Sequence, residues 1–266
     1  MSLIISDLKR VRVVTINRPE ARNAVNPATA KALFQAFLDF DADGSVDAAI
    51  LTGAGGTFCA GFDLKTAADG TATEWIASLD IPDGWNPVAD PRPGPMGPSR
   101  LMLSKPVIAA VEGHAVAGGL ELAAWCDMRV AASDATFGVF CRRWGVPLID
   151  GGTVRLPALL GQGRANDLIL TGRPVGAEEA KQIGLADRVC DTGKALETAM
   201  ALAEDLTRFP QMCMRADHLS ARGGPGQLGD ALRREWRSVG VFAAEGQAGA
   251  ARFASGKGRG GDFNAI

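Results

Sequence analysis

The sequence of 266 residues contains no tyrosine and only two histidines, His114 and His218. Without tyrosine, no phenol serves as an acid or a hydrogen-bond donor, and two histidines so far apart offer no obvious metal centre. The five cysteines form no Cys-x-x-Cys pair and are odd in number. We therefore expect reduced thiols and neither a disulfide framework nor a metal site.

Excess charge and long apolar runs are absent as well. The net charge is -2, from 28 basic and 30 acidic residues, which gives no reason to expect nucleic acid or a membrane surface as a partner. No apolar stretch reaches the roughly 18 residues of a spanning helix, and the N-terminus lacks an apolar run behind a basic start. We expect a cytoplasmic protein with no nucleic-acid or membrane partner.

The sequence does contain strands that alternate with helices. Val11–Ile16 and Ala48–Leu51 are rich in apolar or β-branched residues and are bounded by turn formers, as buried strands are. Between them, Asn26 and Pro27 form a good helix start, with Asn as the N-cap and Pro at the first helical position. Such a β-α-β unit implies parallel strands joined by a right-handed crossover. The pattern recurs in a strand at Val107–Val111, a helix from Gly118 and a strand at Met128–Ala131.

Beyond Gly176 the sequence is typical of helices. We expect them over Ala177–Gly184, Lys194–Arg208 and Gln227–Gly246, which lack the alternation of strands. The chain is therefore predicted to comprise an α/β core over residues 1–190 and a helical region over residues 191–266. The glycine-rich tail from Ser255 is expected to be ordered only by contact with another subunit.

The segment from Lys105 to Asp127 carries the strongest functional signal. After the apolar strand, the pair Gly118-Gly119 opens a helical segment that contains Glu121. Free N–H groups at a helix start attract developing negative charge, and a side chain one turn later lies on the same helix face. Because the neighbours of Glu121 are apolar, its burial would be costly without a function. The segment predicts a pocket that holds an oxyanion beside a carboxylate.

Four segments in order resemble the crotonase, or enoyl-CoA hydratase/isomerase, superfamily. They are NRPEARNAV at 17–25, GGTFCAGFDL at 55–64, the segment at 105–127 and LTGRPVGAEEAKQIGLADRV at 170–189. The resemblance implies an α/β fold with a ββα spiral core, residues 1–190 binding an acyl-CoA thioester, and a C-terminal helical trimerisation region. It also implies a homotrimer or homohexamer, and no cofactor beyond the coenzyme A that is part of the substrate.

The resemblance also places the site residues. It implies that the backbone N–H groups of Phe62 and Gly118 hold the enolate oxygen, with Glu121 as acid/base. Asp63, which follows Phe62, is also placed to cap the next helix. Positions expected to bind the acyl-CoA are Arg22, Ala24, Ala60, Gly61, Asp63, Leu64, His114 and Cys141.

One position departs from the family pattern. Hydratases of this superfamily carry a second glutamate before a Gly-Gly-Thr turn, and that position is Cys141 here. Asp150, three residues before Thr153, stands where the dienoyl-CoA isomerase branch has a catalytic aspartate. Alternatively, Asp150 is a turn residue before Gly151 and Gly152, and a salt bridge to Arg142, Arg143 or Arg155 is a variant of this interpretation. Adjacent arginines would also favour a thiolate at Cys141, a third possibility for the chemistry.

Three functions remain open at this point. The first is an enoyl-CoA hydratase-like reaction through a thioester enolate, with Glu121 as acid/base. The second is an enoyl- or dienoyl-CoA isomerase that uses Glu121 and Asp150. The third is a non-catalytic acyl-CoA-binding paralogue, in which the fold is kept for interaction.

Two further regions bear on the substrate and on assembly. Asp80–Ser99 holds six prolines and three glycines, so it is a loop, either a functional one or a mobile surface insert. In the first case Trp85 and Met96 would supply an apolar wall for an acyl chain. Near the C-terminus an apolar stripe at helical spacing is either core or, as the resemblance favours, a subunit interface; it comprises Leu228, Leu232, Trp236, Val239 and Phe242.

Overall fold

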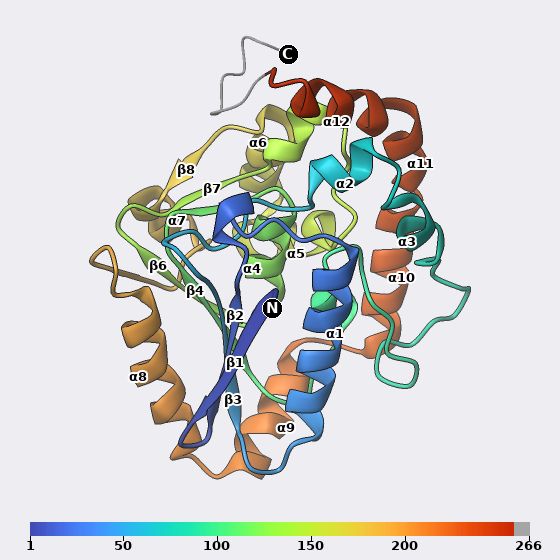
Figure 1. Cartoon of the computed structure of the whole chain (residues 1–266). Coiled ribbons are helices and arrows are strands. Elements are labelled where there is room, and N and C mark those ends of the chain that lie inside the picture. Colours follow the sequence, from blue (N-terminus) through green and yellow to red (C-terminus); the bar gives the residue numbers. More distant parts are fainter. Residues whose placement is uncertain (258–266) are drawn as a thin grey trace.

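A six-stranded sheet is the centre of the molecule, whose computed structural model describes residues 1–257 (Figure 1). Its first strand is antiparallel to the second, and all other neighbouring strands are parallel. In spatial order the strands are β1 (Leu3–Leu8), β2 (Val11–Ile16), β3 (Ala48–Gly53), β4 (Val107–Val111), β6 (Met128–Ala132) and β9 (Arg188–Cys190).

The predicted β-α-β unit is confirmed. Helix α1 (Pro27–Ala42) joins the parallel strands β2 and β3. The side-chain oxygen of Asn26 accepts the amide of Thr29 at 2.9 Å, so Asn26 is the N-cap as expected. Pro27 occupies the first turn, where its missing N–H leaves no helical hydrogen bond unmade.

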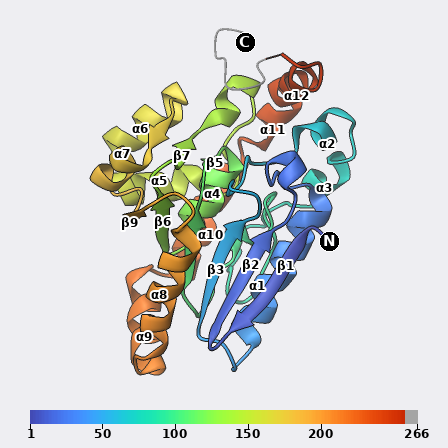
Figure 2. The ribbon, with the colours of Figure 1, turned by 60° about the vertical axis from the view of Figure 1, so that its left-hand side comes forward.

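Two helices cover opposite faces of this sheet, as Figure 2 shows for α1 and α8 (Ala195–Thr207). The period of two along a strand directs Ala49 and Leu51 of β3 into the core beneath α1, and Ala48 and Ile50 toward α8. Small residues let α8 approach the sheet closely; they are Ala195, Ala199 and Ala203. Both faces of the parallel strands are therefore buried.

A second, three-stranded sheet stands beside the first and carries the strand that leads into the site. Its order is β5 (His114–Val116), β7 (Thr136–Gly138) and β8 (Val175–Gly176), parallel and then antiparallel. The short turn after β5 leads directly into α4 (Gly118–Trp125). Further helices follow as α5 (Gly152–Leu160), α6 (Gln162–Thr171) and α7 (Ala177–Ile183), and short ones lie earlier at α2 (Leu64–Ala68) and α3 (Thr73–Ala77).

The C-terminal helices fold back over the same chain. α9 (Gln211–Ala221) is followed by α10 (Pro225–Trp236), α11 (Val239–Val241), a π-helical turn (Phe242–Gly246) and α12 (Gln247–Ala254). The prediction of helical structure over Gln227–Gly246 is confirmed, although the region is divided: α10 ends at Trp236, and α11 and the π-helical turn follow. α12 packs against α2 and against the 3₁₀ turn Phe140–Trp144, where the rings of Trp144 and Phe253 lie 5.3 Å apart.

The central residues of the predicted apolar stripe are part of the protein's own core. Leu232 and Trp236 are buried in the main hydrophobic cluster, and Leu228 and Val239 pack against it. α8, which lies beyond the predicted boundary at residue 190, packs on the sheet. The division at 190 stays a prediction, and most of the glycine-rich tail, residues 258–266, lies outside the described residues.

The insert at Asp80–Ser99 is packed into the molecule. Trp85 and Met96 are both buried. Gly94 and Gly97 exchange backbone hydrogen bonds of 2.8 and 2.9 Å, and the indole N–H of Trp75 donates to the Pro95 carbonyl at 3.2 Å. These contacts favour a functional wall over a mobile surface insert.

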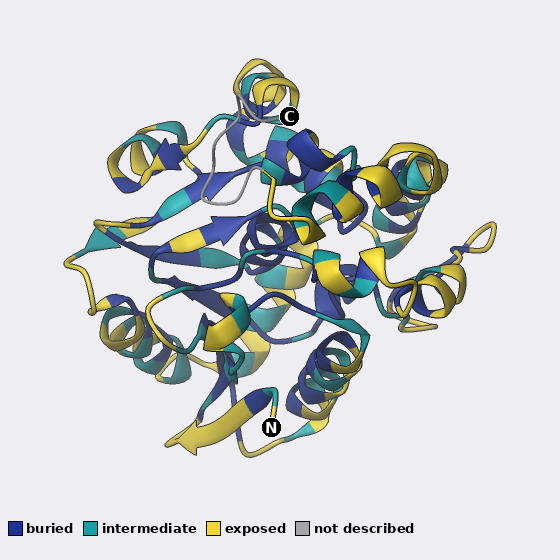
Figure 3. Ribbon diagram, turned by 45° about the horizontal axis from the view of Figure 1, so that its top comes forward, coloured by how far each residue is buried: buried dark blue, intermediate teal, exposed yellow. Residues whose placement is uncertain are grey.

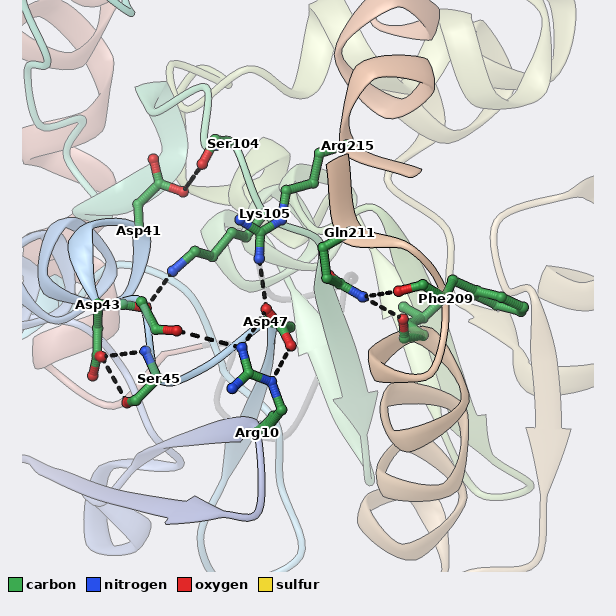
Figure 4. Close-up of polar contacts among 12 residues, drawn as sticks. Arg10, Asp41, Asp43, Ser45, Asp47, Ser104, Lys105, Phe209, Gln211 and Arg215 are labelled. Atoms are coloured by element: carbon green, nitrogen blue, oxygen red, sulfur yellow. Dashed lines mark hydrogen bonds and ion pairs between the residues drawn. The ribbon is translucent and has the colours of Figure 1, made fainter. Parts of the chain in front are cut away.

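A polar cluster fastens α9 to the amino ends of the central strands (Figure 4). The buried carboxylate of Asp47, just before β3, accepts hydrogen bonds from Arg10 at 3.0 Å and from Arg215 of α9 at 2.7 Å. Lys105, just before β4, donates to the carbonyls of Phe40 and Asp43 at 2.8 and 2.6 Å. The opposite, carboxyl ends of β3 and β4 lead toward the segments that form the site.

Within residues 1–257, no helix has the length and apolar character needed to cross a bilayer. The same part of the chain contains no group of three or more His, Cys, Asp or Glu side chains arranged to hold a metal ion.

Candidate active site

Two glycine-containing turns meet at the site. The segment around Phe62 pairs with residues 22–25, because the amide of Val25 donates to Gly61 and that of Asp63 donates to Val25. A Cβ atom added to Gly61 would lie only 3.0 Å from the nitrogen of Gly118. The turn that precedes Phe62 therefore lies directly against the start of α4, as the sequence predicted for two cooperating N–H donors.

Both predicted donors are free. Within residues 1–257, neither the amide of Phe62 nor that of Gly118 donates a hydrogen bond to the protein. Ala117, which precedes Gly118, adopts φ 54° and ψ -127°, a conformation that is rare for a residue with a side chain. Its own amide is held by the carbonyl of Gly138 at 2.8 Å. Strain of this kind persists where the surroundings impose it, and it directs the unpaired N–H of Gly118 outward from the helix start.

Glu121 is buried beside these donors, with 3% of its surface exposed. Its Oε1 accepts the amides of Asp150 and Gly152, each at 2.9 Å. Oε2 accepts no hydrogen bond from the described part of the chain. One oxygen of the carboxyl group is thus fixed by backbone amides, and the other has no hydrogen-bond donor within residues 1–257.

The environment of Glu121 favours its protonated form. Burial raises its pKa well above the usual value, and the negative charges of Asp150 and Glu235 raise the pKa further. The two amides that bind Oε1 act in the opposite direction and are outweighed. A carboxyl group that retains its proton beyond the acidic range is suited to take up and return a proton near neutral pH.

Asp150 points inward. It is 3% exposed, and its Oδ1 accepts the amide of Met96 at 2.9 Å together with the hydroxyl of Ser99. Burial is the main cause of a raised pKa, which hydrogen bonds from Ser99 and Met96 partly offset. Asp150 thus braces the insert and at the same time lies next to Glu121.

Within residues 1–257, the Asp150 carboxylate forms no ion pair with Arg142, Arg143 or Arg155. Arg155 donates to the backbone oxygen of Asp150 at 3.0 Å and to that of Ser99 at 2.7 Å. Arg142 donates to the carbonyl of Ile169, and the guanidinium of Arg143 lies 4.5 Å from the ring of Phe140. A turn paired with an arginine side chain therefore does not describe Asp150.

The surroundings of Cys141 favour its protonated thiol. The thiol is buried, which raises its pKa to about 12, and the charge of Glu121 adds to the increase. The favourable effect of Arg142 is smaller. The expectation that neighbouring arginines favour a thiolate is therefore wrong, because desolvation dominates.

Met96 lies over the start of α4 and has no exposed surface. A Cβ atom added to Gly118 would lie 2.7 Å from the sulfur of Met96. The thioether therefore covers the turn that presents the Gly118 amide, in agreement with the predicted apolar wall. Polarisable, unbranched Met suits a wall that must adapt to different acyl groups.

The remaining predicted binding positions surround these turns to different degrees. Ala24, Ala60, Gly61 and Leu64 are buried or half-buried near Phe62, and the carbonyl of Arg22 accepts the amide of Ala60 at 3.0 Å. Arg22 and His114 have exposed side chains without a hydrogen bond to residues 1–257. Their roles in binding stay predictions.

Asp63 has a structural role. Its carboxylate accepts the amide of Lys65 at 3.2 Å, as the N-cap of α2, and pairs with Arg18 at 3.0 Å. Capping, the alternative offered by the sequence, accounts for Oδ1, and the ion pair with Arg18 accounts for Oδ2.

Sequence reasoning missed Glu235. This residue of α10 is buried beside Asp150 and Glu121, and burial raises its pKa. Its Oε2 accepts the amide of Gly151 at 2.5 Å, and its Oε1 accepts the amide and hydroxyl of Thr153 at 2.8 and 2.7 Å. The only local signal was a glutamate next to Trp236 on an amphipathic helix, which does not reveal a contact across more than 80 positions.

Known proteins are similar to this chain in sequence and in fold. The sequence profile of the enoyl-CoA hydratase/isomerase family matches residues 8–222. An enoyl-CoA hydratase of Mycobacterium tuberculosis is 39% identical over 212 residues, which cover 77% of this chain and 74% of the relative. A carnitinyl-CoA dehydratase of Salmonella typhi is 38% identical over 206 residues, covering 76% and 73%. The solved structure of a carnitinyl-CoA hydratase from Mycobacterium avium is similar with a TM-score of 0.81 and 31% identity, covering 96% of this chain and 95% of the other.

Proposed function

The chain belongs to the enoyl-CoA hydratase/isomerase family and is a hydratase-like acyl-CoA-processing enzyme, and from this premise we propose that it adds water reversibly across the double bond of an enoyl-CoA. The thioester oxygen is bound by the amides of Phe62 and Gly118. Glu121 transfers the proton. The observation that carries the proposal is the pair of unpaired amides beside the single free oxygen of Glu121.

The chemistry follows from these groups. Ionised Glu121 accepts a proton through Oε2 from a water molecule whose oxygen forms a bond to C3 of the enoyl group. The electron pair of the C2–C3 double bond moves toward the carbonyl, and the resulting enolate oxygen is stabilised by the two N–H groups. Glu121 then returns the proton to C2, which completes the hydration. Dehydration of a 3-hydroxyacyl-CoA is the same sequence reversed.

The names of the relatives support hydration over other enolate reactions, since they include enoyl-CoA hydratase and carnitinyl-CoA dehydratase. A single mobile proton on one carboxyl group is sufficient for the steps above. They need no group beyond side chains, backbone amides and water. We therefore propose that the protein uses no cofactor of its own and that coenzyme A enters only as part of the substrate.

A panel of 2-enoyl-CoA thioesters tests the proposal. Hydration removes the conjugation between the double bond and the thioester, so the absorbance of the conjugated chromophore should fall as the 3-hydroxyacyl product appears by mass spectrometry. Incubation of saturated acyl-CoA in D₂O is the second arm. If no product forms and the α-proton does not exchange, the chain is a non-catalytic acyl-CoA-binding protein.

One observation favours a second candidate, an enoyl- or dienoyl-CoA isomerase. Asp150 is buried and inward-facing next to Glu121, and its Oδ2 accepts no hydrogen bond from residues 1–257. A second carboxyl group there is placed to take a proton from one carbon while Glu121 delivers one to another. With a 3-enoyl-CoA, isomerisation would make the absorbance of the conjugated thioester rise, whereas hydration of a 2-enoyl-CoA makes it fall.

Assembly and location complete the proposal. We propose a homotrimer or homohexamer, supported by exposed apolar side chains on and beside α9; they are Phe209, Met212 and Leu219. Light scattering that detects only the 27.7 kDa protomer would refute it. The five free cysteines are compatible with a reducing compartment, and we propose the cytoplasm.

A further inference from the structure

Two carboxylates accept hydrogen bonds from the backbone amides at the start of α5. Successive amides donate to one carboxylate and then to the other. The amides of Asp150 and Gly152 donate to Glu121, and those of Gly151 and Thr153 donate to Glu235. Glu121 comes from α4 and Glu235 from α10. The first amides of a helix have no partner within the helix, so these carboxylates satisfy donors that would otherwise be buried and unpaired.

The turn cannot rearrange independently of either carboxylate. Gly151 has φ 92°, and a Cβ atom there would lie 1.8 Å from Nη1 of Arg155. A Cβ atom on Gly152 would lie 2.9 Å from Oε1 of Glu121. The amides bound to Glu235 and to Glu121 alternate along residues 150–153, and each peptide unit is planar, so a shift of one pair of amides changes the positions of the other pair.

Charged groups from several elements surround this turn. Arg155 of α5 and Arg100 of the turn Pro98–Arg100 stabilise the negative charges of Asp150 and Glu235. Arg100 is buried and lies 4.3 Å from the ring of Trp236, the residue after Glu235. The thiol of Cys141 is the remaining titratable group near Glu121.

From this geometry we infer that Glu235 is a positioning residue, which fixes the general acid/base Glu121 through the amides of residues 150–153 and makes the C-terminal helix α10 part of the active site. The inference rests on the proposed function insofar as Glu121 moves the proton. It assigns Glu235 no contact with substrate, so its effect is exerted on turnover and on the titration of Glu121, with little effect on acyl-CoA binding.

Glu235→Gln tests this role. Gly151 and Thr153 donate to different oxygens of Glu235, and in glutamine one of these oxygens is replaced by an NH₂ group that cannot accept. One amide loses its partner, the turn shifts, and turnover should fall by about 10- to 100-fold with nearly unchanged KM. Removal of the negative charge should also lower the pKa of Glu121, because that charge contributes to raising it. The Glu121 limb of the pH–rate profile should therefore move to lower pH.

Glu112→Gln is the matched control. The Glu112 carboxylate likewise accepts two backbone amides at a helix start, those of Gly193 and Ala195, at 3.0 and 2.8 Å, but at α8. The control should lose thermal stability while keeping its turnover and pH profile. If Glu235→Gln behaves like this control, with a lower Tm and unchanged catalysis, Glu235 is merely structural and the inference is overturned.

A milder variant covers the case in which Glu235→Gln does not fold. Thr153→Val removes only the hydroxyl bond to Oε1 of Glu235, and we expect turnover to fall by about fivefold at constant KM. Unchanged turnover in this variant would overturn the inference. Glu121→Gln separates the two hypotheses: if that variant remains active, the proposed function fails, whereas an inactive Glu121→Gln with an unaffected Glu235→Gln defeats only the role of Glu235.

Discussion

Asp150 accepts the backbone amide of Met96 at 2.9 Å, and this bond connects the proline-rich insert to the turn that holds Glu121. The same Met96 places its thioether against Gly118. Met96, the proposed oxyanion donor Gly118 and the proposed acid/base Glu121 are therefore linked by consecutive contacts. Changes at either end of this series should be measurable at the other.

Glu121→Gln should abolish most of the activity. The amide side chain keeps an oxygen for the amides of Asp150 and Gly152 but cannot take up and return a proton. We expect turnover to fall by at least about a hundredfold with acyl-CoA binding close to wild type. Steady-state kinetics and calorimetric titration with a non-reactive acyl-CoA measure the two quantities. Near-normal turnover would contradict the assignment of Glu121.

Asp150→Asn should separate the two candidate reactions. Asparagine retains an Oδ1 that accepts from Met96 and Ser99, so the insert should stay in place. Loss of the titrating group should remove double-bond migration, whereas hydration by Glu121 should remain within about tenfold of wild type. Both rates are measured on 3-enoyl-CoA and 2-enoyl-CoA. Equal loss of both activities would place Asp150 in the hydration mechanism.

The same variant should change the pH dependence of stability. Burial raises the pKa of Asp150 in the folded protein, so the folded state binds its proton more tightly than the unfolded state. The stability from this protonated group is present at low pH and is lost as pH rises through the raised pKa. Asp150→Asn should therefore gain in Tm relative to wild type as pH increases from about 4 to 8. A difference in Tm that is constant across this range would argue against a buried, titrating Asp150.

Met96→Ala should enlarge the space against Gly118. We expect kcat/KM to rise for longer enoyl-CoA chains relative to short ones, with a loss of about 2–5 kcal/mol in the free energy of unfolding from the cavity. Met200→Ala is the control, since Met200 of α8 packs on the far face of the sheet. If both variants keep the wild-type chain-length preference, Met96 does not form the acyl wall.

Asp47→Asn should weaken the cluster that fastens α9 (Figure 4). The hydrogen bond from Arg10, together with the charges of Arg10 and Arg215, lowers the pKa of Asp47. Its stabilisation is thus present above the unfolded pKa and is lost as pH falls through the lowered pKa. At neutral pH the variant should lose about 1–3 kcal/mol of stability, and this difference should disappear in acid. Asp7→Asn, at an exposed pair with Arg12, should have a much smaller effect.

Local patterns were sufficient to predict much of the core. The Asn26-Pro27 start, the apolar strands and the glycine pair before Glu121 each determine structure over a few residues, and the structure has them as expected. β1 was not predicted, because it is an edge strand whose side chains are largely exposed, as the strand beside the N-terminus in Figure 3 shows. It lacks the buried alternation that identifies a strand.

Long-range contacts account for what the sequence did not reveal about the site. The resemblance assigned roles to Phe62, Gly118 and Glu121 because their motifs are contiguous in the sequence, and these roles stay predictions. Glu235 takes its significance from a turn more than 80 positions earlier in the chain, and no local spacing encodes that contact. The high pKa of Cys141 likewise depends on burial, which outweighs the adjacent arginines visible in the sequence.

The position of α10 after the central sheet and α4 in chain order has a consequence for biosynthesis. A ribosome adds Glu235 only after the central sheet and α4 have been translated, so a nascent chain can fold its core before the start of α5 gains its second carboxylate. Transcripts truncated before α10 would yield a protein that retains the acyl-CoA-binding turns but lacks this support. Catalytic competence would then mark chains that have been translated through α10.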